Sequence, residues 1–97
     1  MTFAVAFHPS ALIEVEEAEA WYSAERAALA DAFIADLEAT VARVATNPFG
    51  WAERWPGVRQ AQLRRFPYLV VFRLRGEAVD VLAVAHSHRA PRYWAGR

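Results

Sequence analysis

The segment from residue 58 to residue 74, VRQAQLRRFPYLVVFRL, limits the possible folds more than any other part of the chain. It contains Pro67, and proline has a fixed φ and no amide hydrogen for a strand ladder, so it belongs at the end of a strand. Residues 58–65 alternate between two faces, whereas residues 69–74 are apolar on both faces. The pattern predicts a half-buried strand with a basic margin, followed by an interior strand. We expect any ligand near that margin.

Before this segment the pattern predicts one strand and two helices. Alternating apolar residues indicate a short strand at residues 2–7, which Pro9 ends. A helix then opens at Pro9-Ser10, with Ser10 or His8 as its cap, and helical periodicity continues to residue 46. Because one helix of this length is unusual in a small domain, we expect two helices with a turn near residues 23–28.

After the helices, residues 47–57 are predicted to form a loop because they contain two prolines and two glycines. Trp51 and Trp55 in this loop are expected to close over an edge of the core. Gly76-Glu77 then turns the chain into a last strand at residues 79–85. The order β-α-α-β-β-β predicts an α+β fold, with a small antiparallel sheet and a two-helix hairpin packed on one face. The other face is expected to be free for arginines.

The composition is typical of one soluble domain spanning residues 1–97. Hydrophobic residues make up 56% of the chain, which is too apolar for disorder, but no apolar run approaches the ~20 residues that span a bilayer. We therefore expect no membrane partner. The N-terminus lacks the features of a secretory signal, and the absence of cysteine is consistent with a reducing cytoplasm.

The net charge of zero conceals a division between the two halves of the chain. Residues 1–53 carry nine acidic residues and two arginines, a balance of −7, whereas residues 54–97 carry nine arginines and two acidic residues, a balance of +7. Such asymmetry can steer a charged partner to one side of the molecule. Alternatively, acidic helices and a basic sheet attract each other within the fold.

Several features, in this order along the chain, are similar to toxins of the RelE/ParE superfamily. They are the order of elements, the glutamate-rich first helix ending in Trp21-Tyr22, the Asn47-Pro48 stop, the segment Arg59 to Tyr68, and the ending His86-Ser87-His88-Arg89-Ala90-Pro91-Arg92-Tyr93-Trp94. The resemblance covers nearly the whole chain. It implies the toxin of a bacterial type II toxin-antitoxin module, blocked by a cognate antitoxin that we expect to be acidic and partly disordered.

The superfamily divides by mechanism, and the resemblance leaves three functions open. ParE-like members are associated with inhibition of DNA gyrase, whereas RelE-like members cleave messenger RNA at the ribosome and commonly use lysines. This sequence contains no lysine, because all eleven basic residues are arginine, and this favours the ParE-like branch. The third interpretation is an inactive remnant that only binds antitoxin. None of the three requires a cofactor.

A RelE-like nuclease would need proton-transfer groups and cations around the scissile phosphate. Arginines suit phosphate, a histidine titrates near neutral pH, and a tyrosine can act as an acid or stack on a base. The candidate catalytic residues are Arg59, Arg65, His88, Arg89 and Tyr93, with His86 as an alternative to His88. The same arginines would serve as phosphate clamps in a noncatalytic nucleic-acid-binding module.

Each candidate also has a structural interpretation. A histidine at a strand end is often held by hydrogen bonds, Arg65 could anchor the acidic helices, and Tyr93-Trp94 could clip the end of the chain onto the core. Strand alternation places His86 and His88 on the same side as Leu82 and Val84. The His-x-His pair, together with Asp80 or His8, is a weak metal-binding pattern, and we expect no metal.

Overall fold

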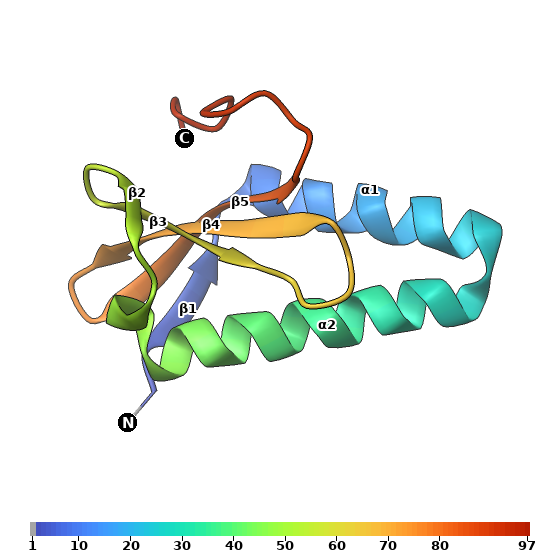
Figure 1. Ribbon diagram of the computed structural model, residues 1–97, viewed down its shortest axis with the longest axis horizontal. Helices are drawn as coiled ribbons and strands as arrows, with labels where there is room; N and C mark the ends of the chain where they lie inside the picture. The colour runs from blue at the N-terminus through green and yellow to red at the C-terminus, as the bar shows by residue number, and fades with distance from the viewer. Residues whose placement is uncertain (1) are drawn as a thin grey trace.

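The computed structural model describes residues 2–97 as two helices and a five-stranded sheet (Figure 1). In chain order the elements are β1 (Ala4–Phe7), α1 (Pro9–Glu25), α2 (Ala27–Thr46), the 3-10 turn η1 (Pro48–Gly50), β2 (Glu53–Trp55), β3 (Val58–Gln62), β4 (Tyr68–Arg75) and β5 (Ala78–His86). The predicted α+β class and the order β-α-α-β-β-β are confirmed, and the region expected to be a loop contains η1 and the short additional strand β2.

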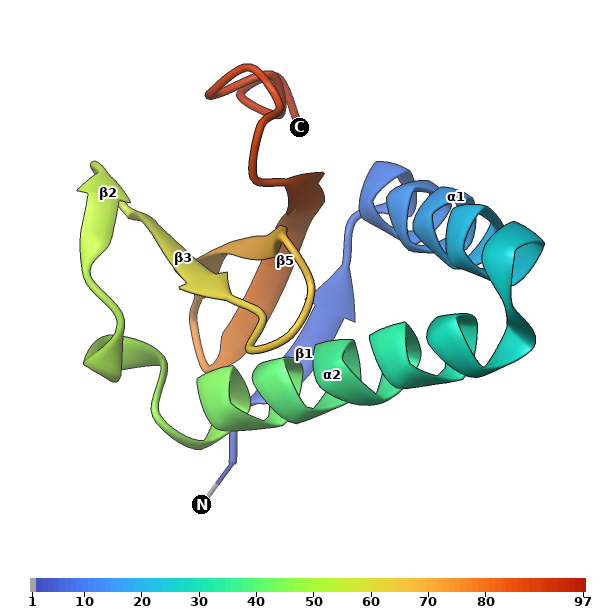
Figure 2. The same cartoon turned by 45° about the vertical axis from the view of Figure 1, so that its right-hand side comes forward.

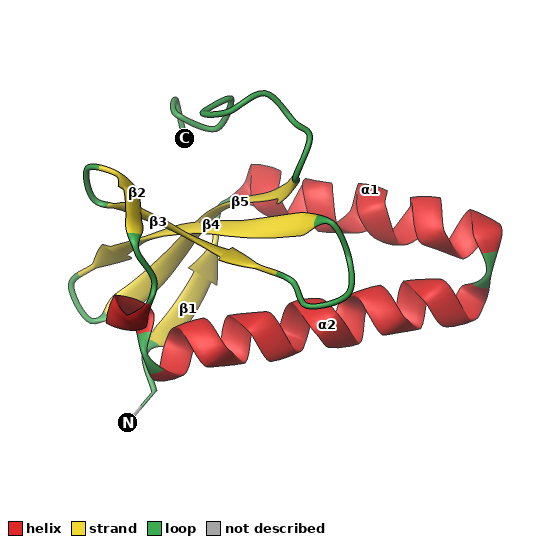
Figure 3. Ribbon diagram, in the orientation of Figure 1, coloured by secondary structure: helices red, strands yellow, loops and turns green. Residues whose placement is uncertain are grey.

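The strands are arranged in the order β1-β5-β4-β3-β2, with both helices on one face of the sheet (Figures 2 and 3). Strands β2 to β5 are joined by antiparallel pairs, but β1 runs parallel to β5, so the sheet is mixed rather than purely antiparallel. Local hairpins dictate antiparallel neighbours, whereas β1 reaches the sheet through the long helical connection, and its direction was not fixed by any local turn.

The helical boundaries follow local chemistry. At the start of α1 the Nδ1 of His8 accepts the amide hydrogen of Ser10 at 3.0 Å, so that His8 is the cap and Pro9 occupies the first turn. The two helices are separated at Arg26, whose backbone is extended, and this confirms the predicted turn. Neither helix of residues 2–97 is long and apolar enough to cross a membrane.

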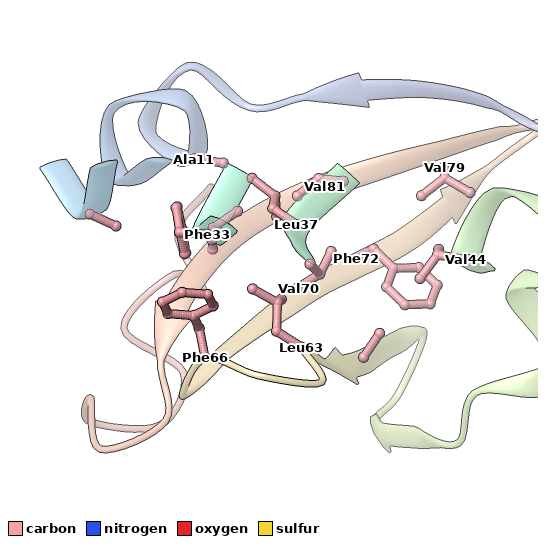
Figure 4. Close-up of a cluster of buried hydrophobic side chains, with 13 residues drawn as sticks. Ala11, Phe33, Leu37, Val44, Leu63, Phe66, Val70, Phe72, Val79 and Val81 are labelled. Carbon is pink, nitrogen blue, oxygen red and sulfur yellow. The ribbon is translucent and has the colours of Figure 1, made fainter. Parts of the chain in front are cut away.

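The main core lies between the helices and the sheet (Figure 4). Phe33 and Val44 of α2 are fully buried against Val70 and Phe72 of β4, and Phe33 also contacts Phe66 edge to face at 5.6 Å. Burial of each large apolar side chain contributes about 1.5–3 kcal/mol, which makes this layer the main source of stability. Trp51 packs at the edge of the same core, as predicted.

The opposite face of the sheet, here called the open face, is covered in part by the tail, residues 87–97. Trp94 of the tail is buried among Val71, Leu82 and Ala83, and Trp55 contacts Trp94 with ring centroids 5.2 Å apart. The expectation that this face is left free for arginines is therefore wrong. A large apolar side chain covers the centre of this face because the strands are apolar on both sides.

A bulge in β5 changes which side chains share a face. Val71 pairs with Ala83 but the next residue, Phe72, pairs with Val81, so that Leu82 has no partner in β4. One extra residue inverts the alternation, so Leu82 packs on the open face while Val84 packs on the helical side. The predicted placement of Leu82 beside Val84 is wrong for this reason.

A buried carboxylate on α2 holds the loop between β3 and β4. Asp36 is 8% exposed and accepts the backbone N–H groups of Arg64 at 3.2 Å, Arg65 at 2.8 Å and Phe66 at 3.1 Å. These three consecutive amides have no strand partner, and the carboxylate satisfies all of them. The loop is thereby tied to α2, with the side chains of Arg64 and Arg65 exposed.

Replacing Asp36 with alanine is expected to lower the free energy of unfolding by about 2 kcal/mol, because three backbone amides, of which that of Phe66 is buried, would lose their acceptor. Urea denaturation of the two proteins measures the difference. The matched control is Asp31→Ala, which removes an exposed carboxylate from the same helix and should change stability by no more than about 0.5 kcal/mol. Equal losses in the two variants would contradict the role given to Asp36.

Candidate functional site

A second buried carboxylate, Glu14 of α1, accepts hydrogen bonds from three separate residues. The donors are the amide of Val84 at 3.0 Å, the hydroxyl of Tyr93 at 2.6 Å and both terminal nitrogens of Arg97 at 3.0 Å each. Arg97 also donates to the carbonyl of Leu82, and the guanidinium of Arg89 lies 3.9 Å from the carboxylate. Helix α1, strand β5 and the tail therefore meet at one side chain.

Glu14 was missed as a functional residue in the sequence, although a signal was present. Glu14 lies three positions after Ala11 and four before Ala18, a helical spacing that places it on the buried face of α1. A carboxylate that is buried there needs hydrogen-bond donors. Its main cationic partner, Arg97, is 83 positions away. No local pattern connects the two residues, so sequence reasoning could not pair them.

The network sets the protonation of its members. Burial alone would raise the pKa of Glu14, but hydrogen bonds from Arg97, Tyr93 and the Val84 amide outweigh it and bring the pKa below its usual 4.5. Burial and the bond to Glu14 raise the pKa of the Tyr93 hydroxyl. At neutral pH the carboxylate is therefore ionised, and the phenol is a neutral donor whose proton points to Glu14.

Two guanidinium groups lie close to the aromatic ring of Tyr93. The central carbon of Arg89 is 4.0 Å from the ring centre and that of Arg97 is 5.2 Å from it. Cations over an aromatic face are attracted by its quadrupole, so Arg89 is positioned by Tyr93. The side chain of Arg89 remains 53% exposed and can still contact a partner. The predicted role of Tyr93-Trp94 as a clip is confirmed.

A cavity of about 270 Å³ lies between the tail and the open face. Trp55 and Trp94 supply aromatic walls, and the polar lining comes from Arg54, Gln60, His86, Ser87, Arg89 and Tyr93. Small-molecule sites usually occupy about 300–1,000 Å³, so this cavity fits one side chain or one base. Two of the five sequence candidates, Arg89 and Tyr93, are brought together here.

The other candidate arginines lie elsewhere. Arg59 donates to the carbonyl of Trp51 and lies 3.8 Å from the carboxylate of Glu53, so its charge is engaged near β2. Arg65 is on the β3–β4 loop, where its guanidinium lies 5.8 Å from the ring centre of Phe66. Asp36 contacts the backbone of Arg65, but no ion pair joins the Arg65 side chain to the acidic helices among residues 2–97.

The two histidines lie close together at the end of β5, where His86 is the last residue of the strand and His88 belongs to the tail. Their ring centroids are 5.3 Å apart, and the backbone amide of His88 donates to Nδ1 of His86 at 3.1 Å. His86 also packs edge to face on Tyr68, while His88 is exposed. No cluster of three acidic, histidine or cysteine side chains suited to a metal ion occurs in the described part of the chain.

Comparison with known proteins identifies relatives of the chain. A family model described as the ParE toxin of a type II toxin-antitoxin system, parDE, matches residues 5–91. A solved structure titled as the chromosomal ParDE TA system from P. aeruginosa is similar in fold, with a TM-score of 0.76 and 19% identity over 88% of this chain and 96% of that chain. None of the curated proteins matches in sequence.

Acid is expected to weaken the Glu14 network. Because the folded pKa of Glu14 is below 4.5, the ionised carboxylate stabilises the protein fully above that pH, and this contribution is lost as the pH falls through the folded pKa. The free energy of unfolding, measured by urea denaturation between neutral and acidic pH, should therefore fall less steeply in Glu14→Gln than in the wild type. The exposed Glu16→Gln is the control and should keep the wild-type pH dependence. Identical slopes in all three proteins would argue against the network.

Proposed function

The chain belongs to the ParE family of type II toxin-antitoxin toxins, and from this premise we propose that it arrests bacterial growth by binding a protein target. The resemblance to ParE-like toxins implies DNA gyrase as that target, and a cognate antitoxin as the inhibitor. The observation that carries the proposal is the family match over residues 5–91, which extends from β1 through β5 into the tail.

The arrangement of the candidate residues supports binding rather than RNA cleavage. Cleavage needs an acid, a base and cations around one phosphate. Here the proton of Tyr93 is donated to Glu14, Arg59 is engaged by Trp51 and Glu53, and Arg65 belongs to a separate loop. Residues held in separate places in this way do not surround one phosphate, but their arginines can still present positive charge to a partner.

The target-binding surface that we propose is the open face beside the tail. Its cavity accepts one side chain, and Arg54 and Arg89 at its rim suit an acidic or hydrogen-bonding partner. Arg54 has no acidic partner among residues 2–97, and Arg89 keeps half of its side chain exposed although it lies 3.9 Å from Glu14, so a partner can reach both guanidinium groups.

An apolar groove supports the proposal of an antitoxin partner. A cavity of about 440 Å³ lies between β1 and α2 and is lined mainly by Phe3, Val5, Phe7, Leu37 and Val41. Because β1 is an edge strand, an extended segment could add to the sheet there and place apolar side chains in the groove. An antitoxin that is acidic overall would also be attracted to the basic rim of the sheet.

Induced expression of the chain alone is expected to arrest growth, and co-expression of the adjacent gene product is expected to restore it. In the arrested cells, mapped messenger RNA 5′ ends should show no new cuts, while purified gyrase should lose supercoiling activity when the chain is added. New cuts at ribosome-bound codons would instead establish the RelE-like nuclease. Normal supercoiling at saturating protein would remove gyrase as the target, and a soluble product without arrest would favour the inactive remnant.

A further inference from the structure

We infer that Glu14 is a positioning residue for target binding: it fixes the tail across the open face, so that Arg89 and the tail side of the cavity are presented in a single arrangement. The inference rests on the proposed function, in which the open face binds the target. Glu14 itself is 7% exposed and does not need to contact the target.

The tail has few other attachments to the sheet. In the described part of the chain, its one backbone hydrogen bond to a residue before β5 joins Ser87 to the carbonyl of Pro67 at 2.8 Å. Residues 87–92 are exposed, and Trp94 is the single deeply buried side chain of the tail. One apolar anchor does not define the direction of a chain, because apolar contacts are not directional. The hydrogen bonds from Tyr93 and Arg97 to Glu14 are directional, and they orient the tail relative to the sheet.

The tail also adopts a conformation that needs support. Arg92 has φ of 64°, in the left-handed region, where a residue other than glycine costs on the order of 1 kcal/mol. The chain reverses at this residue, directly before Tyr93 and Trp94. A strained backbone conformation persists when the surrounding structure holds it in place. Here the two residues that follow Arg92 are held, Tyr93 by Glu14 and Trp94 in the open face.

The position of Arg89 depends on this arrangement. Its guanidinium stacks on Tyr93 at 4.0 Å and lies 3.9 Å from Glu14, so both of its contacts belong to the network. Loss of the carboxylate would release the Tyr93 ring, and with it the surface on which Arg89 rests. The cavity would change as well, because Tyr93 and Trp94 form part of its lining.

A role in positioning accounts for the buried ion pair better than a role in stability alone. Desolvation of a carboxylate and a guanidinium offsets much of their attraction, so such pairs add little net stability compared with apolar residues of similar volume. The ion pair instead fixes the orientation of the side chains, because Arg97 binds both oxygens of Glu14 and also the carbonyl of Leu82. The three contacts together tie Arg97 to both α1 and β5.

The test compares Glu14→Gln and Arg97→Met with the wild type, with Glu16→Gln as a matched control on the exposed side of α1. Both network variants should need about tenfold or more toxin to arrest growth, because a disordered binding surface must be ordered on binding. The amides of residues 87–94 should exchange hydrogen faster. The thermal midpoint should fall in both variants, most in Arg97→Met, which leaves the charge of Glu14 buried without its main cation, so arrest and binding are compared at a temperature at which all the proteins are folded. Binding of the adjacent-gene antitoxin should remain close to the wild type, which a general loss of folded protein would not allow.

Arg97→Met leaves α1 unchanged, so it tests the inference even if Glu14→Gln fails to fold. Arg97→Lys keeps a cation near Glu14 and should recover part of the growth arrest. Arrest by the wild type and equally by both network variants would overturn the inference and leave the proposed function standing. A wild type that is soluble but causes no arrest would remove the proposed function, and the inference with it.

Discussion

The helices are held to the sheet by carboxylates that accept backbone N–H groups. Glu14 of α1 accepts the amide of Val84 in β5, and Asp36 of α2 accepts three consecutive amides after β3. The rest of this interface is apolar, and apolar burial supplies stability without direction. Hydrogen bonds depend on geometry, so the two carboxylates determine where each helix lies along the sheet. A one-turn shift of α1 or α2 would leave a carboxylate buried without donors, which is strongly unfavourable.

Local patterns in the sequence were sufficient to predict most of the fold. Proline positions and periodicity placed the strand ends and the turn near Arg26, and the two tryptophans after α2 pack at the edges of the two apolar clusters, as expected. Two of the features that were not predicted concern distant segments, because no turn or repeat connects β1 with β5 or Glu14 with Arg97. The bulge at Leu82 lies within the hairpin of β4 and β5, where the sequence shows no break in the apolar run to mark it. Such contacts depend on tertiary packing, which local sequence propensity does not predict.

The separation of charge along the sequence survives folding. The one acidic residue of the helices that forms an ion pair within residues 2–97 is Glu14, and its partners are Arg89 and Arg97. The other pairs, such as Arg73 with Asp80, lie within the sheet. Glu16, Glu17 and Glu19 stay exposed on α1 while Arg54, Arg64 and Arg65 stay exposed near the sheet. Few charges are therefore paired between the acidic helices and the basic sheet, and the remaining charges create a long-range field that can steer partners.

The same tail residues would support different chemistry in a different environment. A tyrosine acts as a general acid when its proton can reach the leaving group, and its efficiency depends on a pKa near the working pH. In this chain, burial and the bond to Glu14 raise the pKa of Tyr93, and its proton is donated to Glu14. Arg89 differs from Tyr93 in exposure, because it rests on the ring of Tyr93 while its guanidinium stays accessible to solvent. Under the proposed function, the buried glutamate on the first helix makes residues that resemble a nuclease site into a positively charged surface for binding a partner.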